Sequence, residues 1–430
     1  MKILWMCSVP MPEAAEIMGL RDGVTVSWIV GLSNQLKEKV DLNIAFLSKE
    51  VHEVQEKAGE NITYYAIPQK SKNFTKYDIA SEEYYKDVIL RCQPDLIQVW
   101  GTESIYALTI TNVCKSLGLL DRLIIAIQGL SSIIARHYYA DLPFSLIHKY
   151  SIRDLYRRDS IFDQKRKYAN RGKYEQQTLM LAKNVIGRTT WDYACTNAIN
   201  PQIKYFACNE ILRNSFYTNQ WSYDGCEKYS IFVSQAGYPV KGFHYLLKAL
   251  PEIVKRFPEV QVYVSGSGYQ KDTWKNNLKL TAYQLYIMKM MKKNNLQDRI
   301  HFVGVLNEQE MVERFMKSHV FVSLSTIENE SNSLSEAKIL GIPVIASYVG
   351  GVVDRINHGE DGFLYQHNAT YMLSFFIMKL FQDKELCVNM SEHARRNALQ
   401  VNDKNENVKQ LMNIYHTLYD DRTLDEYKER

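Results

Sequence analysis

Residues 320–365 read VFVSLSTIENESNSLSEAKILGIPVIASYVGGVVDRINHGEDGFLY, and this stretch decides the fold class. Val320–Ser325 is a short, β-branched apolar run that predicts a buried strand, and a polar loop follows it. A helix is expected from Ser331–Asn332 to Leu340, because serine and asparagine are good N-caps and Gly341 suits a helix C-terminus. A strand, a helix and a further strand in this order form the unit from which parallel sheets are built.

The same alternation extends through the whole chain. After residue 228 the other predicted strands are Ser230–Ser234, Val260–Ser265, Ile300–Val305 and Pro343–Ser347. Before it they are Ile3–Ser8, Leu42–Leu47, Ile62–Ile67, Leu96–Trp100, Leu123–Ile127, Val185–Gly187 and Lys204–Ala207. We therefore predict an α/β protein with two Rossmann-like, doubly wound parallel-sheet domains. Such sheets bind ligands at the carboxyl ends of their strands, so a central cleft between the domains is expected.

The length of 430 residues fits two domains of ordinary size. The expected boundaries are 1–212 for the first domain, which includes a helical basic insertion at 130–173, and 229–400 for the second. Residues 213–228 have no hydrophobic period and are interpreted as a linker. Residues 401–430 are expected to contain a C-terminal helix, which could pack on either domain and so cross back to the first.

Composition points to a reducing compartment. The seven cysteines are scattered and form no C-x-x-C pair, so neither a disulfide framework nor a zinc site is expected. The apolar run at the N-terminus is short for a signal peptide, and no stretch approaches the roughly 20 apolar residues of a membrane span. We expect a cytoplasmic protein, with a position at the inner face of the membrane left open.

Two carboxylates flank the start of the predicted helix. Glu328 lies on the loop and Glu336 on the helix, with seven residues between them. The backbone N–H groups of Asn332–Leu334 form the helix N-terminus, which suits an anion such as a diphosphate. Glu336 can accept hydrogen bonds from a ribose diol, and Glu328 can bind sugar hydroxyls. The alternative is that both are solvated carboxylates favoured by the helix dipole.

The stretch resembles the signature of the retaining glycosyltransferases of family 4, the glycosyl transferases group 1, which have the GT-B fold. The matching residues are, in order, Glu328, Glu336-Ala337, Gly341, Pro343-Val344, Gly350-Gly351 and Asp361-Gly362. The resemblance implies a nucleotide-sugar site in the second domain, with Glu336 on the donor ribose and Glu328 on the transferred sugar. The residues implied at the diphosphate are Ser331, Asn332 and Ser333. It also implies transfer that retains the donor's anomeric configuration, typically from a UDP-α-sugar.

Tyr229–Gly242 resembles the first strand and phosphate loop of the family's donor domain. Lys241 matches the family's lysine and is suited to neutralising charge on the leaving diphosphate. Six positions earlier, where the family has an arginine, this chain has Gln235, which donates a hydrogen bond but no charge. Arg188 and Arg213 are candidate substitutes for that cation; the alternative is that they are ordinary arginines.

Further candidates follow from the same resemblance. Gly266 and Val305 close the second and third strands of the second domain, where the family's base pocket lies. Gly23 remains from a glycine pair after the first strand, where the backbone approaches the diphosphate or the acceptor. Many relatives have a histidine directly after a strand in the middle of the first domain. At that place this chain has Gln128. His137 lies near it in the sequence, as an acceptor-side candidate or as a structural histidine.

No metal cofactor is expected, and the nucleotide-sugar would be a substrate. The chain contains no D-x-D triplet and no cluster of histidine and cysteine. The helix N-terminus and Lys241 would instead stabilise the leaving diphosphate, which would help to deprotonate the acceptor.

The net charge of +4 is unevenly spread. Residues 149–173 contain nine Lys or Arg and three Asp, close to Tyr138 and Tyr139. A basic, aromatic surface of this kind can dock on an anionic membrane that carries a lipid-linked acceptor. A solvated helical face is the alternative. Nucleic acid is not expected as a partner, because no recognition motif accompanies the segment.

The leading hypothesis is a hexosyltransferase that moves a hexose or N-acetylhexosamine from a nucleotide-sugar to a glycan or a lipid-linked acceptor in surface polysaccharide synthesis. A sugar-nucleotide epimerase of GT-B fold is the first alternative, because it would share this architecture. Such an enzyme would act on the donor alone. A non-catalytic homologue that binds sugar nucleotide is the second, because Gln235 and Gln128 depart from the family pattern.

Overall fold

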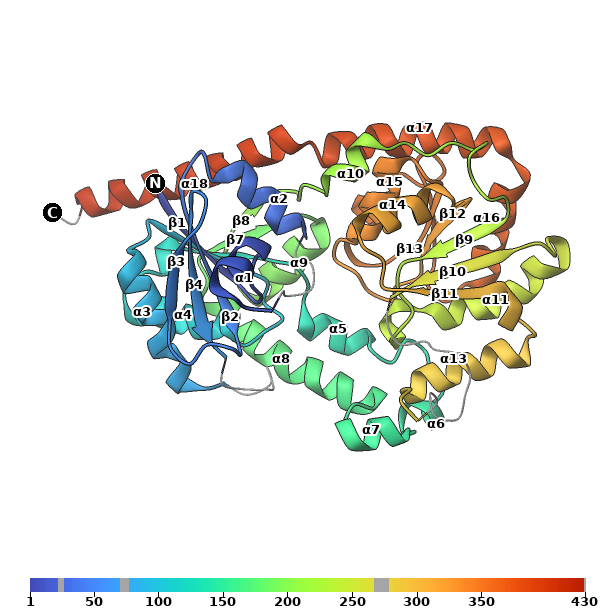
Figure 1. Cartoon of the computed structure of the whole chain (residues 1–430), viewed down its shortest axis with the longest axis horizontal. Coiled ribbons are helices and arrows are strands. Elements are labelled where there is room, and N and C mark those ends of the chain that lie inside the picture. Colours follow the sequence, from blue (N-terminus) through green and yellow to red (C-terminus); the bar gives the residue numbers. More distant parts are fainter. Residues whose placement is uncertain (22–26, 70–76, 267–277, 429–430) are drawn as a thin grey trace. The chain divides into compact units, whose positions relative to one another are not determined.

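The computed structural model describes residues 1–21, 27–69, 77–266 and 278–428 (Figure 1). Its contacts divide the chain into two compact units, each built around one sheet. Unit 1 comprises residues 1–132, 169–211 and 403–430, and unit 2 comprises residues 133–168 and 212–402.

This division corrects the predicted domain boundaries. Residues 133–168, most of the insertion that was expected in the first domain, belong to unit 2. Asp141 accepts a hydrogen bond from Tyr245 at 2.9 Å, and the buried Asp154 accepts one from the backbone N–H of Ala282 at 2.8 Å. These anchors join residues 104 and 128 positions apart, which is why local sequence patterns do not reveal them.

Unit 1 contains an eight-stranded sheet in the order β3-β4-β2-β1-β5-β6-β7-β8. Each neighbouring pair is parallel except β3 and β4. The strands are β1 Lys2–Cys7, β2 Asp41–Ser48, β3 Gln55–Ala58, β4 Ile62–Pro68, β5 Leu96–Trp100, β6 Leu123–Ala126, β7 Asn184–Gly187 and β8 Lys204–Ala207. Hydrophobic periodicity misses β3, because this edge strand has the sequence QEKA and all four residues are exposed.

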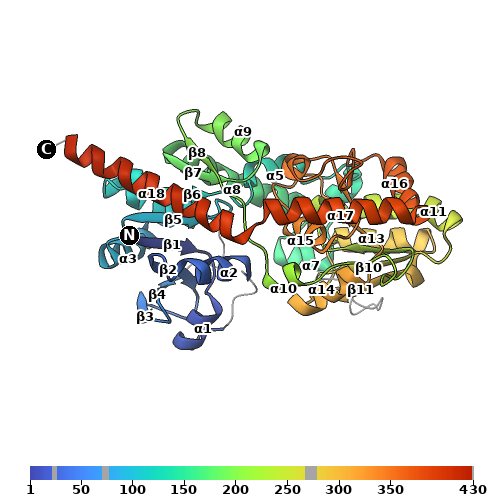
Figure 2. The ribbon, with the colours of Figure 1, turned by 90° about the horizontal axis from the view of Figure 1, so that it is seen from above.

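The last helix of the chain belongs to unit 1. Leu411, Ile414 and Tyr415 of this helix, α18, share a hydrophobic core with Ile3 and Trp5 of β1. Figure 2 shows α18 running across the unit 1 sheet. The helices of this unit are α1 Pro12–Met18, α2 Ser27–Leu36, α3 Glu82–Cys92, α4 Tyr106–Ser116, α9 Thr190–Ile199 and α18 Lys404–Lys428, with most of α8 Ile161–Leu181.

Unit 2 contains a six-stranded parallel sheet in the order β11-β10-β9-β12-β13-β14. The strands are β9 Ser230–Val233, β10 Gln261–Ser265, β11 Ile300–Gly304, β12 Val320–Ser323, β13 Val344–Ser347 and β14 Phe363–Tyr365. The helices are most of α5 Ser131–His137, then α6 Phe144–Ile147, α7 Ile152–Arg157, α10 Asn214–Thr218, α11 Phe243–Arg256, α13 Ala282–Lys293, α14 Glu308–Met316, α15 Asn332–Leu340, α16 Thr370–Gln382 and α17 Lys384–Val401. Unit 1 also contains the short 3-10 helices η1 Ile79–Ser81 and η2 Leu120–Arg122. Unit 2 contains η3 Pro239–Lys241, η4 Gln297–Arg299 and η5 Gly350–Asp354.

The order of the strands locates the ligand-binding edge of unit 2. The chain leaves β9 toward β10 and β11, then returns to β12 on the other side of β9. In doubly wound sheets the ligand crevice lies at the carboxyl ends of the strands at such a reversal. The loops that follow β9 and β12 are therefore expected to carry the site.

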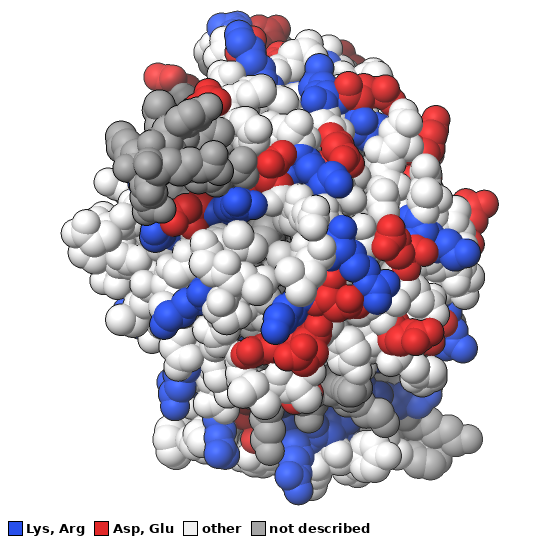
Figure 3. Space-filling view, turned by 90° about the vertical axis from the view of Figure 1, so that its left-hand side faces the viewer, with Lys and Arg blue, Asp and Glu red and all other residues white. Residues whose placement is uncertain are grey.

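The charges on the face of unit 1 shown in Figure 3 are interspersed, with basic and acidic side chains next to one another. Surface ion pairs within this unit agree with that distribution, among them Lys37 with Glu60 at 2.8 Å and Arg91 with Asp87 at 2.8 Å. No helix in the described part of the chain is both long enough and apolar enough to cross a bilayer.

Candidate functional site

Two loops of unit 2 meet where the strand order reverses. The backbone N–H of Thr326, in the loop after β12, donates to the carbonyl of Val240, in the loop after β9, at 2.8 Å. This contact brings Lys241 Nζ to 2.6 Å from Glu328 Oε2. Ser325 Oγ donates to the same carboxylate oxygen at 3.0 Å. The structure thus places Lys241, predicted at the leaving diphosphate, and Glu328, predicted at the transferred sugar, side by side.

Two glycines of the quoted motifs allow this close approach. A Cβ atom on Gly242 would lie 2.0 Å from the Leu324 carbonyl oxygen, and one on Gly350 would lie 1.9 Å from the Glu328 carbonyl oxygen. Both residues also have positive φ, 68° and 51°. Gly351 then donates its backbone N–H to the Glu328 carbonyl at 3.0 Å. Only glycine fits at such contacts, so the backbone of the Glu328 loop is held from both sides.

The ion pair is mostly buried, with 23% of the Lys241 side chain and 19% of the Glu328 side chain exposed. Burial alone would lower the pKa of Lys241, but the charge of Glu328 and its hydrogen bond outweigh that effect. The pKa of Lys241 therefore lies above its ordinary value, and the ammonium group keeps its charge at neutral pH. A fixed positive charge at this edge is suited to a diphosphate.

Glu336 is buried on α15 and faces Arg213. Its Oε1 accepts hydrogen bonds from Nη2 and Nε of Arg213 at 2.6 and 2.9 Å. Burial raises the pKa of Glu336 to about 7, although the positive charge of Arg213 opposes the change. The Arg213 guanidinium also lies 4.6 Å from the ring centre of Phe216. Arg213 is therefore paired with Glu336 in the same way that Lys241 is paired with Glu328, and its role as a substitute for the cation missing at Gln235 stays a prediction.

Two more ion pairs surround the same segment, and sequence reasoning missed both. Arg355 Nε lies 2.8 Å from Glu330 Oε1, and Lys338 Nζ lies 2.9 Å from Asp361 Oδ2. The side chains of Lys338 and Asp361 are almost completely buried. The motif Asp361-Gly362 singled out Asp361 in the sequence, but it did not indicate the partner, Lys338, which stands 23 positions away. Four ion pairs thus hold the Glu328 loop and α15 in place.

The helix that follows Glu328 has the predicted ends. It spans Asn332–Leu340, with Ser331 at the N-cap in extended conformation and Gly341 left-handed at the C-terminus. Ser331, Asn332 and Ser333 are partly exposed. The N–H groups of a first helical turn point away from the helix and attract anions, so this end of α15 can receive a phosphate group.

The residues predicted at the base pocket, Gly266 and Val305, lie at the ends of neighbouring strands. Gly266 donates its backbone N–H to Gly304 at 2.7 Å, and a Cβ atom on Gly266 would lie 3.8 Å from Gln235 Cγ. Val305, which follows Gly304, is 70% exposed. Tyr238 Oη donates to Gln235 Oε1 at 3.1 Å. These residues occupy the carboxyl ends of β9, β10 and β11, next to the Lys241 loop.

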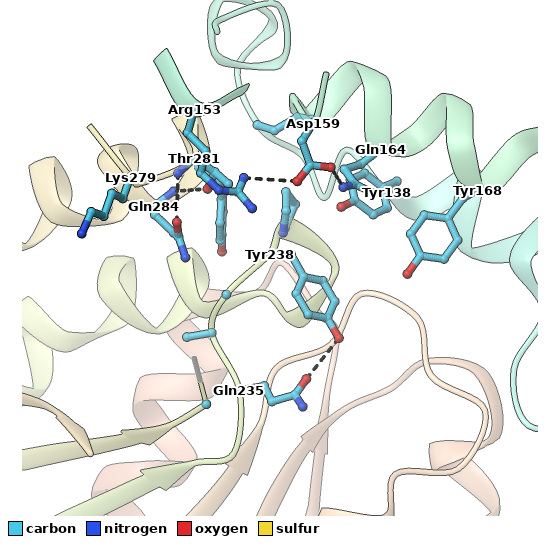
Figure 4. A pocket seen from close by; sticks show the side chains of 16 residues that line it. Tyr138, Arg153, Asp159, Gln164, Tyr168, Gln235, Tyr238, Lys279, Thr281 and Gln284 are labelled. Atoms are coloured by element: carbon cyan, nitrogen blue, oxygen red, sulfur yellow. Dashed lines mark hydrogen bonds and ion pairs between the residues drawn. The ribbon is translucent and has the colours of Figure 1, made fainter. Parts of the chain in front are cut away.

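A cavity of about 480 Å³ lies beside Gln235 within unit 2. One wall comes from the loop after β9, including Tyr238, and the other from the insertion, including Tyr138 and Tyr168 (Figure 4). Arg153 and Asp159 form an ion pair of 3.2 Å on the insertion side. Sequence reasoning missed this cavity because the insertion was assigned to the first domain.

His137, predicted as an acceptor-side candidate or as a structural histidine, lies in unit 2. It ends α5 in unit 2, where its backbone carbonyl accepts a hydrogen bond from Thr326 Oγ1 at 3.3 Å. Burial lowers its pKa, and nearby His367 and Arg136 lower it further, so the imidazole is neutral at pH 7. The insertion carries His137 to the Glu328 loop.

Arg188 and Gln128 are joined in unit 1 by Glu210, a residue that the sequence did not single out. Gln128 Nε2 donates to Glu210 Oε1 at 3.0 Å, and Arg188 forms a buried ion pair with the same carboxylate. Arg188 Nη2 also donates to the carbonyl of Ile127 at 2.9 Å. Arg188 is therefore paired at the carboxyl end of β7 in unit 1, and its role as a substitute cation stays a prediction. Gly23 lies outside the described residues.

Unit 1 holds another buried carboxylate that sequence reasoning missed. Glu175 accepts hydrogen bonds from the backbone N–H groups of Ser131 and Ser132 at 2.6 and 3.1 Å. Burial raises its pKa to about 7, against the effect of these hydrogen bonds.

Among the described residues, no three His, Cys, Asp or Glu side chains are grouped so that they could hold a metal ion.

The whole chain resembles solved glycosyltransferase structures. Sucrose-phosphate synthase from Thermosynechococcus elongatus matches with a TM-score of 0.68 and 15% identity, over 97% of this chain and 99% of the other. Anabaena Alr3699/HepE in complex with UDP-glucose matches with a TM-score of 0.64 and 15% identity, over 96% and 99%. With two doubly wound parallel-sheet units, the chain is a protein of the GT-B fold, which confirms the predicted fold class.

Residues 217–397 match the family described as "Glycosyl transferases group 1". For these residues the match confirms the resemblance to the glycosyl transferases group 1 that was seen in the sequence. N-acetyl-alpha-D-glucosaminyl L-malate synthase from Bacillus anthracis is 31% identical over 137 residues, which cover 32% of this chain and 35% of that relative. The similarity to such relatives thus spans well under half of their length.

Proposed function

We propose that this protein is a retaining, metal-independent glycosyltransferase. It moves a hexose or N-acetylhexosamine from a nucleotide-sugar, with UDP as the expected nucleotide, to a glycan or a lipid-linked acceptor in surface polysaccharide synthesis. The reaction takes place in the cytoplasm, at the inner face of the membrane where the acceptor is lipid-linked. The observation that carries the proposal is the Lys241–Glu328 pair at the strand-order reversal of unit 2, with Glu328 in the loop that leads into α15, the helix that carries Glu336.

Each of these groups has a part in binding the donor. Glu336 accepts hydrogen bonds from the ribose hydroxyls, and the first turn of α15 with Lys241 receives the diphosphate. Glu328 binds hydroxyls of the transferred sugar. Because Lys241 and Glu328 already lie 2.6 Å apart, the cation and the sugar-binding carboxylate are held together before the donor arrives.

This arrangement supports a transfer in which the leaving group and the acceptor share one face of the sugar. The bond between the anomeric carbon and the diphosphate oxygen breaks, and an acceptor hydroxyl forms a new bond to that carbon on the same face. Because the new bond forms on the face that the diphosphate leaves, the α-configuration is kept, and the proton of the hydroxyl passes to the departing phosphate. Lys241 contributes by stabilising the negative charge that develops on the leaving group.

The similar proteins support the choice of substrates. The Anabaena protein was solved with UDP-glucose, which favours a UDP-sugar here. The name of the Bacillus anthracis relative contains an N-acetylglucosaminyl group, which favours an N-acetylhexosamine as one candidate sugar. The cavity beside Gln235 offers tyrosines Tyr138, Tyr168 and Tyr238, whose rings can stack on a sugar.

The test is release of nucleoside diphosphate from a panel of UDP-, GDP- and ADP-sugars. We expect the wild type to hydrolyse one donor slowly without an acceptor, and Glu328→Gln and Lys241→Ala to lose this activity. EDTA is expected to leave the rate unchanged. An epimerised sugar would assign the protein to the epimerases instead, and absence of sugar-nucleotide binding would refute the proposal.

A further inference from the structure

The insertion of unit 2 exposes an unusual concentration of apolar side chains. Six of the 18 large hydrophobic residues that are exposed in the described part of the chain lie between residues 144 and 162. The most exposed are Tyr156 at 89%, Phe144 at 77%, Leu155 at 65% and Ile152 at 63%. We name these four residues, with Tyr150 and Phe162, the α6–α7 surface. Exposed apolar side chains that are scattered singly over a protein are normal, whereas several in one short segment favour a contact surface.

The α6–α7 surface is firmly attached to unit 2. Leu146 and Ile147 of α6 are buried, and Ser151 and Asp154 close a capping box at the start of α7. Asp154 also accepts the hydrogen bond from Ala282 at the start of α13. The His148 ring lies 4.3 Å from Phe144 and 5.5 Å from Phe162, measured between ring centres. The exposed side chains thus stand on a fixed support.

The charges around this surface are sorted by sign. Asp154 is completely buried, and Asp159 is paired with Arg153 at 3.2 Å and Lys167 at 3.0 Å. The exposed charged residues between 143 and 158 are Lys149, Arg157 and Arg158. Between residues 143 and 158 the chain therefore presents cationic and apolar groups to solvent, and the exposed carboxylate of Asp141 lies just before this stretch.

A groove of about 710 Å³ adjoins the same surface and carries four lysines. We name it the lysine groove; its basic lining residues are Lys149, Lys248, Lys289 and Lys293, all of them exposed. Its described lining residues include no carboxylate. Lys149 belongs both to the groove and to the loop between α6 and α7, and Figure 1 shows α6 beside α13, which supplies Lys289 and Lys293. The lysine groove therefore adjoins the α6–α7 surface at Lys149, which stands next to Tyr150 in the chain.

We propose that the α6–α7 surface and the lysine groove dock this protein on an anionic phospholipid bilayer. The apolar side chains enter the boundary between headgroups and acyl chains, and the lysines bind the phosphate groups around them. A soluble polyanion would use the lysines but would leave Ile152, Leu155 and Tyr156 without a role. The proposal rests on the proposed function in one respect, because a lipid-linked acceptor would lie in the same bilayer.

The experiment is flotation of the full-length protein with lipid vesicles, without donor or acceptor. We expect binding to vesicles with about 30% phosphatidylglycerol, weak binding to pure phosphatidylcholine, and loss of binding as salt rises from about 0.1 M to about 0.5 M. Exchanging Lys248, Lys289 and Lys293 for alanine is expected to lower the partition coefficient about 100-fold, since each basic residue near the surface contributes about fivefold. The triple change Ile152→Ser, Leu155→Ser and Tyr156→Ser is expected to lower it at least about tenfold.

The matched control is the double change Tyr371→Ser and Phe375→Ser, which removes exposed aromatic residues from α16 of the same unit. It should bind vesicles like the wild type, and nucleoside diphosphate release in the absence of lipid should be unchanged in all these variants. Failure of the wild type to bind anionic vesicles overturns the docking proposal, whatever the enzymatic activity. Binding that survives the serine changes and is competed fully by soluble polyphosphate also overturns it, since it would identify a polyanion site.

Discussion

Lys241 Nζ lies 2.6 Å from Glu328 Oε2, although 87 residues separate the two in the chain. They follow β9 and β12, which are neighbours in the unit 2 sheet at the point where the strand order reverses. Both side chains are largely buried, so each stabilises the charge of the other. Removing one of them leaves the other without its counter-charge.

Lys241→Ala is expected to lower the rate of nucleoside diphosphate release about 10²–10³-fold, because a fixed cation at the leaving group is lost. Glu328→Gln should also lower the rate, and the double variant should lose less than the product of the two effects, since the residues act as one unit. The measurement is kcat with the preferred donor, and circular dichroism checks the fold. Fully additive effects would contradict the coupling.

Donor binding should depend on pH through Glu336, whose pKa lies near 7. Above this pH the carboxylate is ionised and accepts hydrogen bonds from the ribose; below it the carboxyl is protonated and loses part of this capacity. The Kd for the nucleoside diphosphate is therefore expected to rise as the pH falls from 8 to 6, and Glu336→Gln should flatten the profile. Calorimetric titration at several pH values measures both. An equally steep profile in the variant would assign the titration to another group.

Gly242→Ala should destabilise the protein far more than Gly359→Ala. Both glycines have positive φ, 68° and 87°, so both substitutions cost about 1 kcal/mol of backbone strain. A Cβ atom meets the Leu324 carbonyl at 2.0 Å at position 242, whereas nothing lies within 4 Å of one at position 359. The clash adds about 1–3 kcal/mol, so the melting temperature of Gly242→Ala should be clearly the lower of the two. Equal melting temperatures would contradict this expectation, because they would show that the Leu324 backbone can move away from position 242 without loss of stability.

Gln235→Arg is expected to tighten binding of the nucleoside diphosphate about tenfold, because a charge-assisted hydrogen bond replaces a neutral one. Gln235 is exposed and lies next to Gly266 at the edge of the sheet, so a longer side chain fits there. Binding of the uncharged nucleoside should not change. Calorimetry with both ligands makes the comparison, and Gln235→Glu, which adds the opposite charge, should weaken diphosphate binding. If the arginine leaves the diphosphate Kd unaltered, Gln235 does not face the phosphates.

Tyr415→Phe should weaken the attachment of α18 to unit 1. The Tyr415 hydroxyl accepts a hydrogen bond from Trp5 Nε1 at 2.9 Å and donates one to Gln98 Oε1 at 2.5 Å, and all three side chains are buried. Loss of the hydroxyl leaves two buried polar atoms without this partner and costs about 1–3 kcal/mol of unfolding free energy. Urea unfolding measures the change. Tyr371→Phe is the control, because Tyr371 is exposed and should tolerate the change.

Much of the fold was predictable, because local patterns carry it. The central strands of parallel sheets are buried on both faces and are therefore continuous apolar runs, as in β9, β12 and β13. The ends of α15 were predictable from Ser331 and Gly341: Gly341 has the left-handed conformation that ends a helix, and Ser331 stands at the N-cap, although its side chain makes no capping hydrogen bond. The edge strand β3 was not, because it buries no side chain.

The amino-acid sequence by itself determined the two parallel-sheet units, the α15 helix and the set of residues that resembles the family motif, since periodicity, caps and spacing are local properties. Only the tertiary structure decided which charges meet. It paired Glu328 with Lys241 and Glu336 with Arg213, and it fixed residues 133–168 to unit 2. Ion pairs and buried hydrogen bonds depend on distances between side chains, and those distances are set only when segments far apart in the chain pack together.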